Sequence, residues 1–223
     1  MADHTEDALI REVNDDLREE QMMLLWKRYG SSIITVALLI VVIVAGYQGW
    51  KKYDISTRTD DGNRFYAASQ LATSGNADKA IQAFGDLSLK SDSGYALLSQ
   101  LRQAALMASQ KDIAGATVLY QKIAHDHASD VAISGLANIL GATLEINSDT
   151  FDKNGMMLRL ETIVNKGSPY RYSAKELMGL VALKSGDMAK ALEIFKSLTD
   201  DNATPKGIHE RAKNLVEFTG QKN

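Results

Sequence analysis

The residues best suited to chemistry lie in the segment AHDHASD, where His125 and His127 flank Asp126, with Asp130 following. Imidazole and carboxylate groups bind metals, but a zinc site needs typically three or four ligands in a defined arrangement. Two histidines this close together offer no clear third ligand, and the small polar residues around them are typical of a turn between helices. We therefore favour a solvated loop here and expect no metal and no cofactor.

Other catalytic patterns are missing from the sequence. Cysteine is absent from all 223 residues, which excludes disulfides and a thiol nucleophile, and His209 stands alone. The sequence contains no glycine-rich phosphate loop and no serine in a nucleophile-elbow pattern. Most carboxylates are interspersed with Lys or Arg, as on ordinary helix surfaces. We expect the protein not to be an enzyme.

An uncharged segment of 21 residues, Gly30 to Trp50, dominates the first quarter of the chain. A helix crosses a bilayer core of about 30 Å with about 20 apolar residues, so this segment can span it once. A cleaved signal would have a short basic leader and a shorter apolar core, whereas here 29 residues with eight acids precede the run. The segment is predicted to be an uncleaved anchor, flanked by aromatic residues that suit the headgroup level: Trp26, Tyr29, Tyr47, Trp50 and Tyr53.

The anchor divides the chain into three predicted parts. Residues 1–29 form an acidic tail of net charge −4, 30–50 the transmembrane helix, and 54–223 a domain of net charge −1. Neither soluble part has the basic balance of a nucleic-acid binder. Basic residues near the span do not decide the orientation, because four lie on each side: Arg11, Arg18, Lys27 and Arg28 before it, and Lys51, Lys52, Arg58 and Arg64 after it.

The tail and the large domain both have helical patterns. In the tail, apolar residues recur at helical spacing with acids on the other face, which predicts an amphipathic helix: Ile10, Val13, Leu17 and Leu24. The large domain is rich in Ala, Leu, Gln, Lys and Glu, with short breaks such as SGNAD (74–78) and KSGD (184–187). The pattern predicts an all-α domain built of helical hairpins.

One hairpin has the spacing of a tetratricopeptide repeat. In Ser173 to Pro205, Gly179 lies in the first helix, and Ala191 and Phe195 lie one turn apart in the second. Small residues let paired helices approach, the aromatic ring fills the gap beside them, and Pro205 ends the helical pattern.

Weaker copies precede this hairpin, and the small second-helix residues are spaced by 36, 39 and 36 residues. The small residue and the residue four positions later are Ala80 and Phe84, Ala116 and Tyr120, Gly155 and Arg159, and Ala191 and Phe195. In the second copy Lys111 stands where the turn glycine is expected, and the third copy is the faintest because Arg159 replaces an aromatic residue. The small first-helix residues are Ala68, Ala104, Ala142 and Gly179. A more polar segment after Pro205 is predicted to be the C-terminal capping helix.

Stacked hairpins form a concave face that binds peptides or proteins. The groove-facing positions of the first helices include Ser69 and Ala105, and the Lys, Asn and Arg set of a carboxylate clamp is missing from them. These positions either bind apolar segments of a partner or pack inside the domain, and packing is the commoner role of apolar residues. The large apolar residues among them are the candidate protein-binding residues: Phe65, Leu98, Leu101, Leu180 and Leu183.

The tail REVNDDLREEQ, the join LWKRYG, a single span ending near Gly-Trp, and degenerate tetratricopeptide hairpins together resemble the YfgM-like family, ancillary subunits of the bacterial SecYEG translocon. The resemblance covers the whole chain in layout and is most specific over residues 11–53. It implies a single-pass protein of the bacterial inner membrane with a cytoplasmic amino terminus and a periplasmic repeat domain. Translocon subunits, periplasmic chaperones and unfolded client chains are the partners that it implies.

Two other functions remain open. The protein could be an anchored scaffold that assembles another cell-envelope complex, or a scaffold whose repeats face the cytoplasm. Co-purifying partners would separate the first from a translocon role, and protease added to spheroplasts would separate the second.

Overall fold

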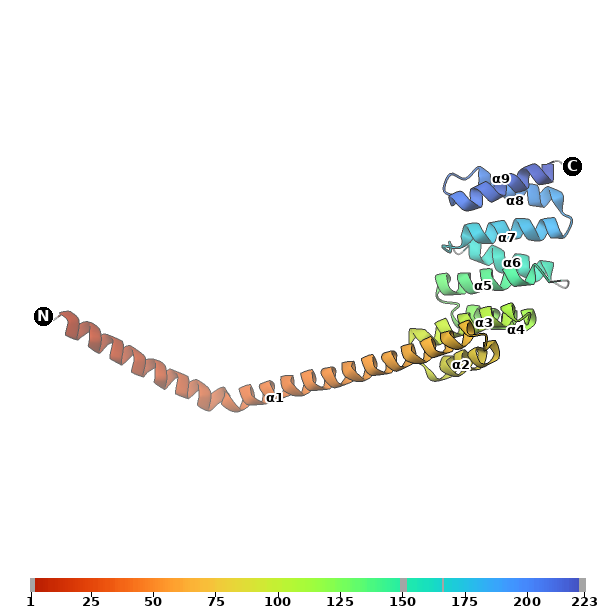
Figure 1. Cartoon of the computed structure of the whole chain (residues 1–223). Coiled ribbons are helices and arrows are strands. Elements are labelled where there is room, and N and C mark those ends of the chain that lie inside the picture. Colours follow the sequence, from red (N-terminus) through yellow and green to blue (C-terminus); the bar gives the residue numbers. More distant parts are fainter. Residues whose placement is uncertain (1–2, 149–151, 166, 221–223) are drawn as a thin grey trace. The chain divides into compact units, whose positions relative to one another are not determined.

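The computed structural model describes residues 3–148, 152–165 and 167–220, with the backbone alone for 3–21 and Gly220 (Figure 1). Within these ranges all regular structure is helical, which confirms the predicted all-α class. The helices are α1 (Asp3–Thr73), α2 (Ala77–Lys90), α3 (Gly94–Ser109), α4 (Ile113–Asp126), α5 (Val131–Glu145), α6 (Lys153–Asn165), α7 (Arg171–Lys184), α8 (Met188–Thr199) and α9 (Lys206–Gly220).

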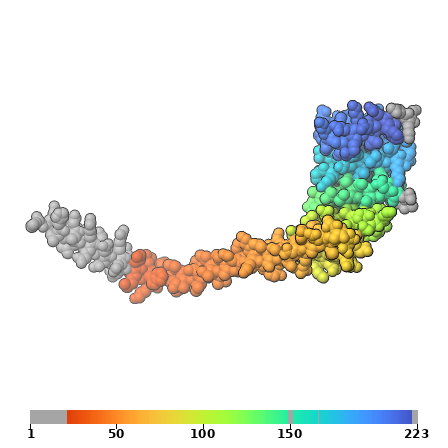
Figure 2. Space-filling model, viewed as in Figure 1, coloured from red at the N-terminus to blue at the C-terminus, as the bar shows by residue number. Residues whose placement is uncertain are grey.

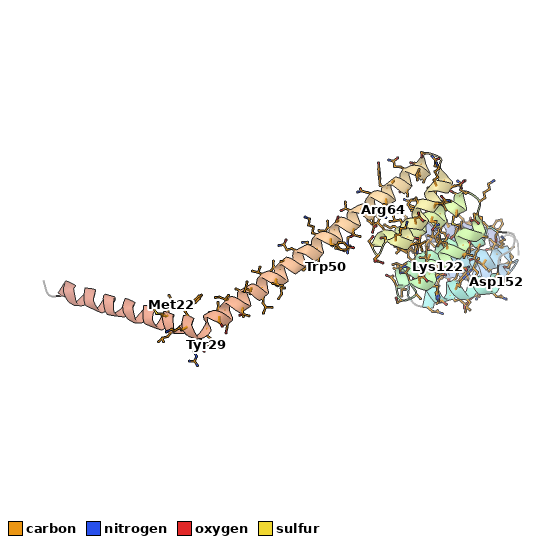
Figure 3. The ribbon with its side chains drawn as sticks, turned by 90° about the horizontal axis from the view of Figure 1, so that it is seen from below. Met22, Tyr29, Trp50, Arg64, Lys122 and Asp152 are labelled. Atoms are coloured by element: carbon orange, nitrogen blue, oxygen red, sulfur yellow. The ribbon has the colours of Figure 1, made fainter. Side chains whose placement is uncertain are left out.

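The chain divides into two compact units, Met1–Thr57 and Arg58–Asn223, and α1 contributes to both. In the first unit, the stretch of α1 from Met22 onward contains a segment long and apolar enough to cross a membrane. Apolar side chains along it are exposed, including Trp50, labelled in Figure 3, at 67%. The side chains of Ile10, Val13 and Leu17 lie outside the described ones, so the amphipathic tail remains a prediction.

The second unit is a stack of helical hairpins. The last part of α1 pairs with α2, α3 with α4, α5 with α6, and α7 with α8, while α9 packs on α8. Figure 2 shows these segments following one another in sequence order through the unit. α6 packs more extensively on α7 than on its own hairpin partner α5.

Close helix contacts occur at the predicted small residues. Ala68, Ala104 and Ala142 of the first helices are at most 3% exposed. Ala80, Ala116 and Ala191 of the second helices are fully buried, and the rings four positions later are at most 4% exposed: Phe84, Tyr120 and Phe195. This burial confirms the predicted register for three of the four hairpins.

The register predicted for the third hairpin is wrong by one residue. Met156 and Leu160 occupy the fully buried positions of α6, whereas Gly155 and Arg159 are only partly buried. The reason is the helix start: the Asp152 carboxylate accepts a hydrogen bond from the backbone N–H of Asn154 at 3.1 Å and so caps α6.

Two other second helices have the same kind of start. Asp112 caps α4 and Asp187 caps α8, and the buried small residue follows each cap by four positions. Counting four residues from Asp152 gives Met156. The position of the capping aspartate therefore fixes which residue of the second helix is buried. In the third hairpin this residue is a methionine, where the other hairpins have alanine.

The residue before the cap lies in the left-handed region in three hairpin turns. Gly75 has a φ of 81°, Lys111 of 68° and Gly186 of 77°. Glycine takes this conformation without a steric penalty, whereas a residue with a Cβ does not. Lys111 thus adopts the backbone conformation of the glycine that it replaces.

Candidate protein-binding surface

The five candidate binding residues differ in exposure. Phe65 is partly buried, and its ring centroid lies 5.2 Å from that of Phe84 and 5.6 Å from that of Tyr95. Leu101 is partly buried against the cluster around Ala104 and Tyr120. These two residues have packing roles inside the domain.

The remaining three candidates lie on α3 and α7. Leu180 and Leu183 pack against the cluster of the last hairpin, which contains Phe195. Leu98, in contrast, is 47% exposed on α3. It is the residue among the five whose side chain is most open to a partner.

A pocket of about 260 Å³ lies between the last turns of α1 and the second half of α3, and Phe84 of α2 also lines it. Two predicted groove positions, Ser69 and Ala105, are in its lining. The full lining is Ser69, Ala72, Thr73, Phe84, Arg102, Ala105, Leu106 and Ser109. We call it the α1–α3 pocket.

The hydroxyl groups of the α1–α3 pocket are used within their own helices. Ser69 Oγ donates to the carbonyl oxygen of Phe65 at 2.9 Å, Thr73 Oγ1 to that of Gln70 at 3.0 Å, and Ser109 Oγ to that of Leu106 at 2.7 Å. The pocket therefore presents mainly apolar surface. Arg102 is the charged residue of its lining.

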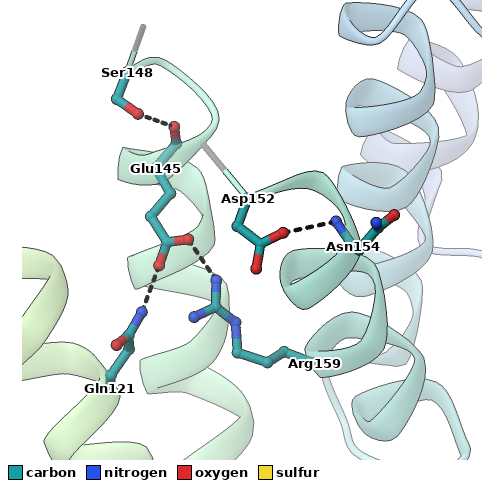
Figure 4. A network of polar contacts seen from close by, with 6 residues as sticks. All are labelled: Gln121, Glu145, Ser148, Asp152, Asn154 and Arg159. Atoms are coloured by element: carbon teal, nitrogen blue, oxygen red, sulfur yellow. Dashed lines mark hydrogen bonds and ion pairs between the residues drawn. The ribbon is translucent and has the colours of Figure 1, made fainter. Parts of the chain in front are cut away.

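A second pocket, of about 360 Å³, lies between α4, α5 and α6. At this place Glu145 joins the three helices, as Figure 4 shows. Its carboxylate accepts a hydrogen bond from Gln121 Nε2 of α4 at 2.8 Å and forms an ion pair with Arg159 of α6. In the corrected register Leu160 fills the position where the other copies have an aromatic ring. Arg159, next to it in the chain, forms a polar link to α5.

The role of Glu145 is not evident from the sequence. The residue precedes Arg159 by 14 positions on another helix, so no local pattern joins them. The departure of Arg159 from the repeat pattern was the available signal.

The His125–Asp130 segment has structural roles. The Asp126 carboxylate is paired with Lys122, and this hydrogen bond lowers the pKa of Asp126. Asp130 caps α5 by accepting hydrogen bonds from the backbone N–H groups of Ala132 and Ile133. No group of three or more His, Cys, Asp or Glu residues that could hold a metal is found in the described part of the chain.

Comparison with protein families adds one finding. The model of the tetratricopeptide repeat-like domain matches residues 24–218. No curated protein matches the sequence.

Proposed function

Because the chain belongs to the tetratricopeptide repeat-like family, we propose that it is a membrane-anchored protein-binding module that catalyses no reaction itself. Tetratricopeptide-like domains are generally protein-interaction modules, since stacked hairpins offer an extended surface. The observation that carries the proposal is the exposed leucine Leu98, one turn from the α1–α3 pocket on a first helix.

The proposed anchor is the segment 30–50, with residues 54–223 as the binding domain. Arg58, where the second unit begins, follows Trp50 by eight positions in the chain. Even a fully extended chain of that length reaches at most about 28 Å. The binding domain therefore starts near the membrane surface and meets partners there.

The proposed location is the bacterial inner membrane, with a cytoplasmic amino terminus and a periplasmic repeat domain. Resemblance to the YfgM-like family supports this location and the proposed partners, which are translocon subunits, periplasmic chaperones and secreted chains as they emerge. The protein would hold such chains or chaperones close to the site of translocation.

Crosslinking in living cells tests the binding role. A photoactivatable residue replaces Leu98 in one strain and Leu89 in another, because Leu89 is also an exposed leucine, at 86%, but lies on the second helix α2. We expect discrete protein adducts from position 98 and few from position 89. Equal adducts from both positions, or none from position 98, would contradict the proposal.

Protease added to intact spheroplasts tests the location. Loss of the 54–223 domain is expected for a periplasmic domain. Survival of the domain, with cleavage after lysis as the control for accessibility, would show that it faces the cytoplasm.

A further inference from the structure

The α1–α3 pocket combines apolar lining with one cation. Its hydroxyl groups donate to carbonyls of their own helices, so they are not free to donate to a ligand. Ala72, Phe84, Ala105 and Leu106 supply the rest of the surface apart from Arg102. A volume of about 260 Å³ is enough for one medium-sized aliphatic side chain.

Arg102 is exposed and carries an uncompensated charge at this pocket. No carboxylate of the described residues lies within ion-pair distance of it, and no acidic residue lines the pocket. Two other arginines of the stack are paired with carboxylates, Arg159 with Glu145 and Arg211 with Glu176. A free guanidinium beside an apolar pocket attracts an anionic group.

Leu98 extends the same face of α3. Residues 98, 102, 105 and 109 fall on one stripe of the helix, so the order along it is an exposed leucine, the arginine and then the pocket. A bound segment following this stripe meets an apolar surface on both sides of the cation.

We propose that the α1–α3 pocket binds a polypeptide segment in which an aliphatic side chain is adjacent to an Asp or Glu residue. The aliphatic group enters the pocket, and the carboxylate pairs with Arg102. This inference rests on the proposed protein-binding function and adds the chemical class of the bound segment.

The probes are three Gly-Ser peptides with a central photo-leucine followed by Glu, Gln or Lys. They are photolysed with the full-length protein in nanodiscs, and the crosslinked residues are identified by mass spectrometry. We expect crosslinks within 69–73 and 102–109, with a yield about threefold higher for the Glu peptide than for the Lys peptide at low salt. High salt should remove most of this preference.

Two variants and a control complete the test. Arg102→Glu should reverse the order of the Glu and Lys peptides, whereas Ala105→Phe should lower the yield of all three by filling the pocket. Lys196→Glu changes an exposed charge on α8 and should leave the order unchanged. Circular dichroism shows that each variant is folded.

The outcomes separate this inference from the proposed function. An order that is the same in the wild type and Arg102→Glu would overturn the role of the cation. Crosslinks from all peptides at Leu98 or Leu183 but not in the pocket would overturn the pocket and leave the binding function standing. No crosslinks in the stack, together with no adducts from position 98 in cells, would contradict both.

Discussion

The ring of Phe195 lies directly against the backbone of Gly179, so that a Cβ built on Gly179 would stand 2.4 Å from Cε1 of the ring. Phe195 is fully buried, which leaves the ring little freedom to move away. A side chain at position 179 therefore forces α7 and α8 apart.

Gly179→Ala should destabilise the repeat domain by about 2 kcal/mol, in the range of overpacked cores. Urea unfolding of the detergent-solubilised protein, followed by circular dichroism, measures the loss. Gly94→Ala is the matched control, because a Cβ there meets nothing within 4 Å. Phe195→Leu should lower the free energy of unfolding by less in the Gly179→Ala background than in the wild type. Additive costs would show that the two residues do not compete for space.

Lys111→Gly should stabilise the protein by about 1 kcal/mol, because Lys111 holds a φ of 68° that glycine takes without a penalty. Gly186→Ala, at the equivalent turn with a φ of 77°, should destabilise by a similar amount. Unfolding midpoints of the two variants test the pair. If Lys111→Gly instead destabilises the protein, the contacts of the lysine side chain stabilise it by more than the strained backbone destabilises it.

Met156→Ala should cost about 3 kcal/mol, as is usual for removing a fully buried methionine. Leu158→Ala, two residues further along α6 at a side chain that is 67% exposed, should change stability by less than about 0.5 kcal/mol. Thermal melting of both variants distinguishes the core position from the exposed one. Equal losses would contradict the register that Asp152 sets.

Tyr172→Phe should lower the free energy of unfolding at neutral pH and lower it less in acid. Two hydrogen bonds lower the pKa of Asp201. The backbone N–H of Ala203 donates the first, and the Tyr172 hydroxyl donates the second to Asp201 Oδ2 at 3.0 Å. A carboxyl whose pKa is lowered on folding contributes stability above its unfolded pKa, near pH 4, and loses it as the pH falls through the folded pKa. Urea midpoints of the wild type and the variant should therefore converge as the pH falls below about 4. A constant difference across that range would remove Asp201 from the explanation.

Local sequence patterns predicted most of this fold. Ala80, Ala116 and Ala191 were recognisable because a small residue and an aromatic ring recur at a fixed separation, and burial bears out their register. The third hairpin broke the pattern, since Met156 is not small and Leu160, four positions later, is not aromatic. Its aspartate cap was the better marker, because a cap fixes where a helix starts regardless of which side chain fills the core.

The binding surface was less predictable than the fold. Whether an apolar residue of a first helix packs or stays exposed depends on how closely the neighbouring helix approaches, and the sequence does not encode that distance locally. Leu101 is therefore partly buried while Leu98, three residues earlier, is 47% exposed. The sequence does not single out Arg102 either, because the unpaired state of its charge depends on which residues lie near it in the folded stack.

The closer packing of α6 on α7 than on α5 has a mechanical consequence. In a stack where each helix holds mainly its neighbours, tension applied at one end passes through every interface in series. Among the interfaces between consecutive helices from α2 to α9, as far as the structure describes them, the one between α5 and α6 is the sparsest, and Arg159 and Glu145 bridge it. Under tension we therefore expect α5 and α6 to separate before the helices on either side of them do.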